Sequence, residues 1–253
     1  MRHLSELIII LLLVEVVLPD VLSVQKLYED ANKKYISGDY PGSIEIYKKI
    51  IDNDYESDKI YYNIGNAYYR MGKLGYSILY YEKALKLNPK NGDARFNLKL
   101  ANLRIKDRIE VPPPFFLIEW YRNLKNIYSS SGWAKILSFW MLLLSFIFVG
   151  YNFISSTVIK RVLKFIIAVV AILLLINLVL LIDKFCDENT NNYGIVLIPS
   201  LECLSAPQEG SVVLFIIHEG LKVRVLYKED QWLRIELPDG KQGWVRENTI
   251  GII

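Results

Sequence analysis

The sequence predicts a multidomain membrane protein with an all-α helical repeat array, a two-helix transmembrane hairpin and a small all-β barrel. The segment 24–110 repeats itself with a period of about 34 residues. The runs 136–154 and 165–182 are almost wholly apolar, and the segment 195–253 alternates β-rich runs with turn residues. Of the 253 residues, 52% are hydrophobic, which is more than usual for a soluble protein.

The N-terminal segment 1–23 has the order of a secretory signal peptide. Arg2 supplies a basic end, residues 7–14 form an apolar run, and residues 21–23 resemble a cleavage site. Glu15 interrupts the apolar region, so an uncleaved membrane anchor is the alternative. Either outcome exports the chain that follows.

The segment 24–110 contains two copies of one helical pattern and the start of a third. Gly38 and Gly72 occupy equivalent turns, and small residues recur where paired helices approach each other. The pattern resembles the tetratricopeptide repeat. The second copy fits best, at Tyr61, Ile64, Gly65, Tyr68, Ser77, Tyr81, Ala84 and Pro89. In the first copy Asp30 and Lys34 stand where Ile64 and Tyr68 do, so its packing face is weaker.

The resemblance implies a concave groove lined by the first helix of each pair. The residues at these positions are Tyr28, Asn32, Tyr35, Tyr62, Asn63, Asn66, Tyr69, Phe96 and Asn97. They form either a protein-binding groove or only the scaffold, because the same string is close to the general repeat pattern. Grooves of this family that bind a terminal carboxylate carry Lys or Arg where this chain has Tyr28, Tyr62 and Phe96, so such a ligand is not expected.

The segment 111–133 leads from the repeats to the apolar runs. Pro112, Pro113 and Pro114 stop the helices and favour an extended spacer. An amphipathic helix is predicted over 115–133, with Trp120, Tyr121, Trp133 and Trp140 as aromatic anchors at the membrane surface. The alternative is a core helix of the repeat domain.

The segment 134–182 is predicted to be a transmembrane hairpin, because only the loop 155–161 separates its two apolar runs. Lys160, Arg161 and Lys164 cluster at this loop, and short basic loops stay in the cytoplasm. Both flanking regions are therefore predicted to be periplasmic, on an inner (cytoplasmic) membrane. Asn177 is the clearest polar interruption, and we expect it to join the two helices.

After a predicted linker at 183–194, the segment 195–253 reads as short strands. The turns 218–220 and 238–240 separate runs rich in β-branched and aromatic residues, and Gly243-Trp244-Val245 follows. This order resembles the bacterial SH3-like barrel, which binds peptides or cell-wall fragments in some proteins and is a spacer in others. Trp232 and Trp244 form either a ligand surface or part of the packing.

Nothing in the sequence nominates an enzyme, a metal site or a cofactor site. His218 lies in a predicted turn without a nucleophile in a known motif, and no phosphate loop or metalloprotease motif occurs. The scattered basic residues do not indicate a nucleic-acid partner. Cys186 and Cys203 both fall on the oxidising side, so a disulfide closing a loop of about 17 residues is possible. The membrane beside Cys186, and a core-facing strand at Cys203, would oppose it.

The order of these parts resembles the E-type member of the Bat (aerotolerance operon) family, most clearly from Asn97 through Pro114 to Phe116. The resemblance implies an inner-membrane protein that acts with von Willebrand A-domain membrane proteins and a MoxR-type AAA+ ATPase system. It implies a role in envelope integrity or stress (oxygen) tolerance. Two hypotheses follow: a non-enzymatic scaffold that binds a protein partner and membrane lipid, or a receptor whose SH3-like domain binds cell-wall peptide.

Overall fold

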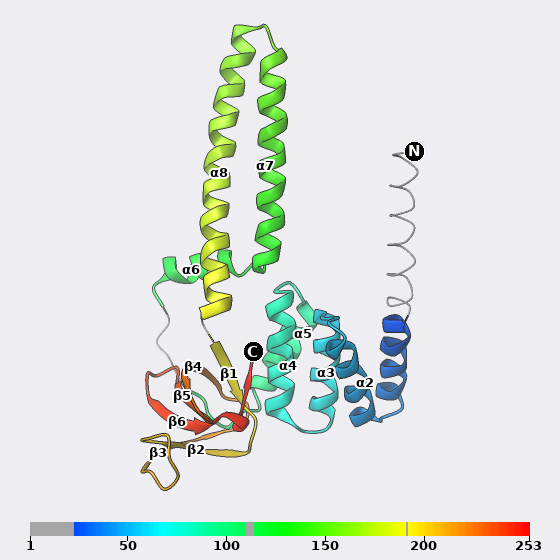
Figure 1. Cartoon of the computed structure of the whole chain (residues 1–253), viewed down its shortest axis with the longest axis vertical. Helices are drawn as coiled ribbons and strands as arrows, with labels where there is room; N and C mark the ends of the chain where they lie inside the picture. The colour runs from blue at the N-terminus through cyan, green and yellow to red at the C-terminus, as the bar shows by residue number, and fades with distance from the viewer. Residues whose placement is uncertain (1–22, 110–113, 191) are drawn as a thin grey trace.

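The computed structural model describes residues 23–109, 114–190 and 192–253. Figure 1 shows a group of antiparallel helices, a long helix pair and a β-sheet domain. The predicted signal peptide, apart from Ser23, and two of the three prolines lie outside the described residues. The repeat helices are the segment 23–36, α2 (Tyr40–Asp52), α3 (Asp58–Arg70), α4 (Leu74–Leu87) and α5 (Gly92–Asn102).

The repeat helices begin and end where the sequence supplies caps and turns. Gly38 and Gly72 have φ angles of +85° and +74°, a left-handed conformation that favours glycine, and each closes a helix. The Ser57 and Asn91 side chains accept hydrogen bonds from the first turns of α3 and α5. The two repeat copies share one hydrophobic core. The first copy, whose packing face is weaker, contributes Ala31 to this core.

Three further helices follow the repeats: α6 (Phe116–Lys125), α7 (Ser130–Phe153) and α8 (Thr157–Thr190). Helices α7 and α8 are both long and apolar enough to cross a membrane. They run side by side in opposite directions (Figure 1). The connection between them is residues 154–156, shorter than the predicted loop 155–161, because the basic residues there belong to the first turns of α8.

The structure corrects the predicted helix over 115–133. The helix α6 ends at Lys125, and Trp133 belongs to α7. Trp133 is only 7% exposed, and its indole Nε1 donates a 3.0 Å hydrogen bond to the Lys125 carbonyl across the break. Trp133 therefore holds the corner between α6 and α7, whereas Trp120 is 63% exposed on α6.

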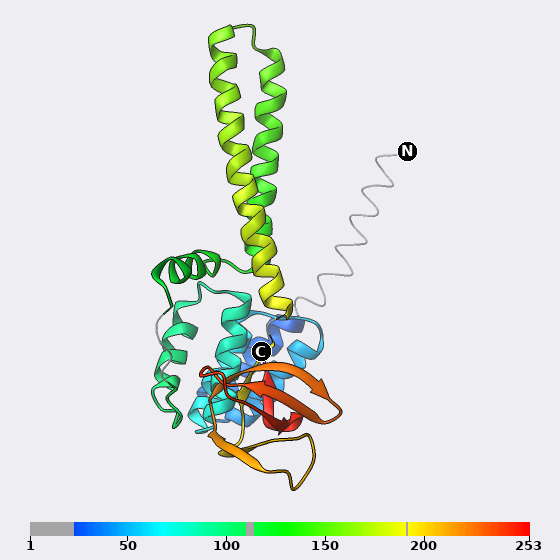
Figure 2. The same ribbon diagram turned by 90° about the vertical axis from the view of Figure 1, so that its left-hand side faces the viewer.

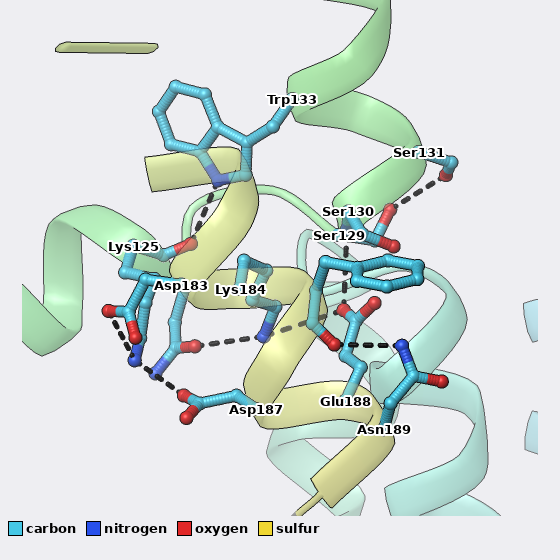
Figure 3. A network of polar contacts seen from close by, with 12 residues as sticks. Lys125, Ser129, Ser130, Ser131, Trp133, Asp183, Lys184, Asp187, Glu188 and Asn189 are labelled. Atoms are coloured by element: carbon cyan, nitrogen blue, oxygen red, sulfur yellow. Dashed lines mark hydrogen bonds and ion pairs between the residues drawn. The ribbon is translucent and has the colours of Figure 1, made fainter. Parts of the chain in front are cut away.

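The predicted linker 183–194 is also corrected, since α8 continues to Thr190. The charged residues that suggested an end to the helix are bonded to the corner between α6 and α7 (Figure 3). Lys125 Nζ lies 3.0 Å from Asp183 Oδ2 and 2.5 Å from Asp187 Oδ2, and Tyr121 Oη donates to Asp183 at 2.8 Å. Burial acts to lower the pKa of Lys125, but its bonds to the two aspartates outweigh burial and raise it.

The C-terminal domain is a seven-stranded antiparallel sheet in the order β3-β2-β6-β5-β4-β1-β7. The β-rich runs and turns of the sequence predict β3 to β6, and the strand expected at Cys203 is β2, whereas β1 and β7 are not predicted. Gly220 and Gly240, with φ of +89° and +86°, close the two predicted turns. The strands are β1 (Asn192–Val196), β2 (Ser200–Leu204), β3 (Val213–His218), β4 (Lys222–Glu229), β5 (Trp232–Glu236), β6 (Gln242–Arg246) and β7 (Ile250–Ile252), with a 3-10 turn at Glu247–Thr249.

The sheet domain packs directly on the repeats, at the same end of the helix pair (Figures 1 and 2). Ile78 and Leu79 of α4 and Ile195 of β1 form one buried cluster. The Glu219 carboxylate accepts a 2.8 Å hydrogen bond from the Gly75 backbone N–H in the first turn of α4. This carboxylate therefore caps a helix 144 residues away in sequence, where the helix dipole favours a negative charge.

Candidate protein-interaction site

Most residues of the predicted groove belong to a ladder of hydrogen bonds that joins one first helix to the next. In its first step, Tyr47 Oη donates to Asn32 Oδ1 at 2.5 Å. Asn63 Nδ2 of α3 lies 3.0 Å from Tyr47 Oη and 3.2 Å from Tyr28 Oη. These bonds link four polar side chains of three helices, so they help to hold the repeats together.

The second step repeats the first one repeat later. Tyr81 Oη donates to Asn66 Oδ1 at 2.7 Å, and Asn97 Nδ2 of α5 lies 2.9 Å from Asn66 Oδ1 and 3.3 Å from Tyr62 Oη. Burial raises the pKa of Tyr47 and that of Tyr81 to about 12, so both phenols stay protonated as donors.

In the described part of the chain the ladder stops at α5, because no further repeat helix follows it. Phe96, Leu100 and Leu103 are 62%, 39% and 59% exposed, and their spacing of four and three residues puts them on one side of the helix. The opposite side of α5 is packed against the cores through Ala94, Leu98 and Ala101. The last repeat helix thus exposes an apolar stripe, which we call the α5 stripe: Phe96, Leu100 and Leu103.

The chemistry of the α5 stripe differs from that of the earlier repeats. One repeat earlier, Tyr62 and Asn66 stand at the positions of Phe96 and Leu100, and both are bonded to the next helix. Replacing them by Phe and Leu removes the polar groups of the ladder and leaves apolar surface. The end of a helical repeat array is ordinarily polar, because it faces water. Among the predicted groove residues, Phe96 is the one that combines high exposure with an apolar side chain.

Two other predicted groove residues are half-covered by neighbours. The ring of Tyr35 packs edge-on against Tyr40, with centroids 5.3 Å apart. The Arg104 guanidinium lies 5.2 Å from the centroid of the Tyr69 ring. Neither tyrosine presents an open aromatic face of the kind that Phe96 does.

The two tryptophans of the SH3 domain are buried and do not form an exposed aromatic surface. Trp232 and Trp244 are each 8% exposed. The Arg246 guanidinium lies 4.3 Å from the Trp232 ring centroid, and the Tyr227 ring packs edge-on against Trp244 at 5.2 Å. Within the described residues both indoles therefore act as packing groups, in line with the packing alternative.

The possible bridge between Cys186 and Cys203 is absent, since both are thiols in the described part of the chain. Cys203 points into the barrel core and is fully buried, whereas Cys186 is exposed on α8. Burial raises the pKa of the Cys203 thiol to about 12, so it stays protonated and unreactive.

His218 has a structural place at the join between the repeats and the barrel. Its backbone N–H donates to Asp107 Oδ2 at 2.5 Å, and its Nδ1 lies 2.8 Å from Asp107 Oδ1. Lys106 Nζ lies 2.8 Å from Nε2, and because an ammonium only donates, Nε2 is the acceptor and Nδ1 carries the proton. Over residues 23–109, 114–190 and 192–253, no cluster of His, Cys, Asp or Glu is placed to bind a metal ion.

Comparisons with known families agree with both domains. Residues 58–91 match the family model described as tetratricopeptide repeat, and residues 31–72 match a second model described as TPR repeat. Residues 202–251 match the bacterial SH3 domain. The chain has tetratricopeptide repeats near its N-terminus and a bacterial SH3 domain near its C-terminus. No curated protein matches the chain. Both kinds of domain indicate protein–protein interaction.

Proposed function

We propose that this chain is a non-enzymatic scaffold of the inner membrane, anchored by α7 and α8, whose tetratricopeptide repeats hold a helix of a protein partner. The observation that carries the proposal is the α5 stripe. One repeat earlier, the equivalent positions of α3 are covered by α5, the first helix of the next repeat. On α5 the three apolar side chains at these positions are exposed. A partner helix that adds there would bury them, as an amphipathic helix does in a hydrophobic groove.

The position of the repeats supports a role at the membrane. The repeats and the SH3 domain share one end of the helix pair (Figure 1). Helix α6 lies across this end with Phe116, Leu117 and Trp120 exposed by 66%, 53% and 63%. An amphipathic helix with exposed aromatic residues suits the boundary between lipid and water. We propose that both domains lie on the periplasmic side and residues 154–156 in the cytoplasm, because Lys160, Arg161 and Lys164 cluster at the other end of the helix pair.

The order of the parts, which resembles the E-type member of the Bat family, supports a more specific role. Von Willebrand A-domain membrane proteins and a MoxR-type AAA+ ATPase system are then the expected partners, and envelope integrity or stress (oxygen) tolerance the expected process. The receptor hypothesis, in which the SH3 domain binds cell-wall peptide, has less support because Trp232 and Trp244 are nearly covered.

A site-specific photo-crosslinking experiment tests the proposal in native membranes. The full chain carries p-benzoylphenylalanine at position 96, or at position 36 as the control. Ile36 is 83% exposed but lies at the other end of the array, so the two probes differ in place rather than in exposure. We expect one adduct of defined mass from position 96 and none from position 36.

A second substitution ties the adduct to the α5 stripe. Leu100→Glu places a charge beside position 96, and loss of an apolar contact at a binding centre costs about 2 kcal/mol, or roughly 30-fold in affinity. Asn102→Glu, which also adds one negative charge to an exposed position of α5 but on another side of the helix, should leave the adduct intact. Equal adducts from positions 36 and 96, or an adduct that survives Leu100→Glu, would contradict the proposal.

A further inference from the structure

A cavity of about 780 Å³ lies where the repeats, α6, the end of α8 and the SH3 domain meet. Binding sites for small molecules in proteins commonly have volumes of this order. Its lining is strongly basic and includes residues of four helices and two strands. The cations are Lys86, Arg95, Arg122, Lys125, Lys184 and Lys222.

Half of this positive charge is neutralised inside the protein. Each of the three acidic side chains in the lining forms an ion pair with one cation. The other three cations have no acidic partner in the lining. The pairs are Glu82 with Lys222 at 2.9 Å, Asp187 with Lys125 at 2.5 Å and Glu188 with Lys184 at 3.7 Å.

Lys86, Arg95 and Arg122 have no acidic side chain as a partner. Lys86 Nζ donates to the main-chain oxygen of Ile253 at 2.9 Å, and Arg95 donates to the Pro89 carbonyl, an uncharged acceptor. Within the described residues, none of these three cations pairs with an Asp or Glu side chain, and all three are exposed. Arginine pairs are well suited to phosphate, because each guanidinium presents two parallel N–H donors.

The position of the cavity indicates where an anion would come from. Arg122 and Lys125 line it from α6, whose exposed apolar residues include Phe116 and Trp120. One helix thus presents an apolar surface suited to lipid and two cations to the cavity. A site beside such a helix lies at the depth of phospholipid headgroups when α7 and α8 span the bilayer.

We propose that this cavity binds the phosphate group of an anionic phospholipid. The lipid phosphate lies among Lys86, Arg95 and Arg122 and joins the repeats to α6. This proposal rests on the membrane anchoring within the proposed function, but not on the partner at the α5 stripe.

The test uses the purified full chain in detergent micelles, with phosphatidylglycerol or phosphatidylcholine added, and native mass spectrometry to count bound lipid. We expect retention of one phosphatidylglycerol, about tenfold in preference to phosphatidylcholine. The variant with Lys86→Gln, Arg95→Gln and Arg122→Gln should lose this preference. The matched control with Lys26→Gln, Lys59→Gln and Lys99→Gln, three exposed cations outside the cavity, should keep it.

Three results would overturn the proposal. Equal retention of both lipids by the unmodified chain refutes it without any variant, so a folding defect in the triple variant leaves the test decisive. Equal losses in both triple variants would show a general effect of charge. Displacement of phosphatidylglycerol by millimolar inorganic phosphate would assign the site to the free anion. Carbonate extraction of membranes tests the anchoring separately, since an anchored chain stays in the pellet whatever lipid it retains.

Discussion

A glycine in the first turn of α4 offers the sharpest test of how the repeats and the SH3 domain are joined. A Cβ at Gly75 would meet the Val196 carbonyl oxygen of β1 and would lie 2.9 Å from the Glu219 Cγ. The carbonyl belongs to the backbone, so it cannot rotate away as a side-chain tip can. Gly75→Ala should therefore push the SH3 domain off α4 and weaken the Glu219 cap.

The magnitude follows from two effects of opposite sign. Alanine favours a helix over glycine by up to about 1 kcal/mol. Overpacking costs roughly 1–3 kcal/mol, and loss of a hydrogen bond to a charged group costs about 1.5–3 kcal/mol. We expect a net decrease of about 2 kcal/mol in the free energy of unfolding. The matched control is Gly92→Ala in the first turn of α5, where a Cβ meets nothing within 4 Å.

The assay is hydrogen exchange of the full chain in micelles, together with thermal unfolding. Gly75→Ala should speed exchange in β1 and β7, the strands that contact α4, whereas Gly92→Ala should leave both unchanged or slower. Equal stability and equal exchange for the two variants would refute the close approach of β1 to α4.

Further predictions concern the ladder, the thiols and the corner beneath the helix pair. Tyr81→Phe should lower the free energy of unfolding by about 1–2 kcal/mol in urea titrations, because it removes one ladder bond, whereas Tyr76→Phe should change it little. Iodoacetamide at pH 8 should alkylate the exposed Cys186 in the folded chain and spare Cys203 until the barrel unfolds. Because folding raises the pKa of Cys203 from 9.0 to about 12, its contribution to stability is complete below pH 9.0 and falls as pH rises toward 12. Lys125→Met should loosen α6 from α8, seen as faster exchange in α6, since it leaves two aspartates without their cation.

The sequence predicts the turns and close helix contacts of the fold where they depend on residues near one another in the chain. Gly65 was expected at the contact between paired helices, and a Cβ there would lie 2.7 Å from the Tyr81 ring. The turns at Gly38, Gly72 and Gly220 were likewise set by positive φ angles. Such residues act through helix spacing and backbone conformation, which short sequence windows reveal.

The sequence does not predict features that depend on contacts between residues far apart in the chain. The charged residues after Ile182 predict an end to the second apolar helix, yet they are bonded to α6 and α8 continues to Thr190. The sequence pattern does not predict the packing of the SH3 domain on α4, although Leu79 stands where the first copy has the exposed Glu45. The exposed stripe at the end of the array also required the structure, because burial of the other face of α5 depends on α4.

Cysteine accessibility in intact cells tests the central claim, that the repeats and the SH3 domain lie together outside the cytoplasm, most directly. In a chain with Cys186→Ser and Cys203→Ser, single cysteines are placed by Lys33→Cys in the repeats, Ser155→Cys between α7 and α8, or Glu209→Cys in the SH3 domain. A membrane-impermeant maleimide applied once the outer barrier is opened should label the first and third positions, and should label position 155 only after the inner membrane is disrupted. Labelling of positions 33 and 209 from opposite sides of that membrane would contradict the account.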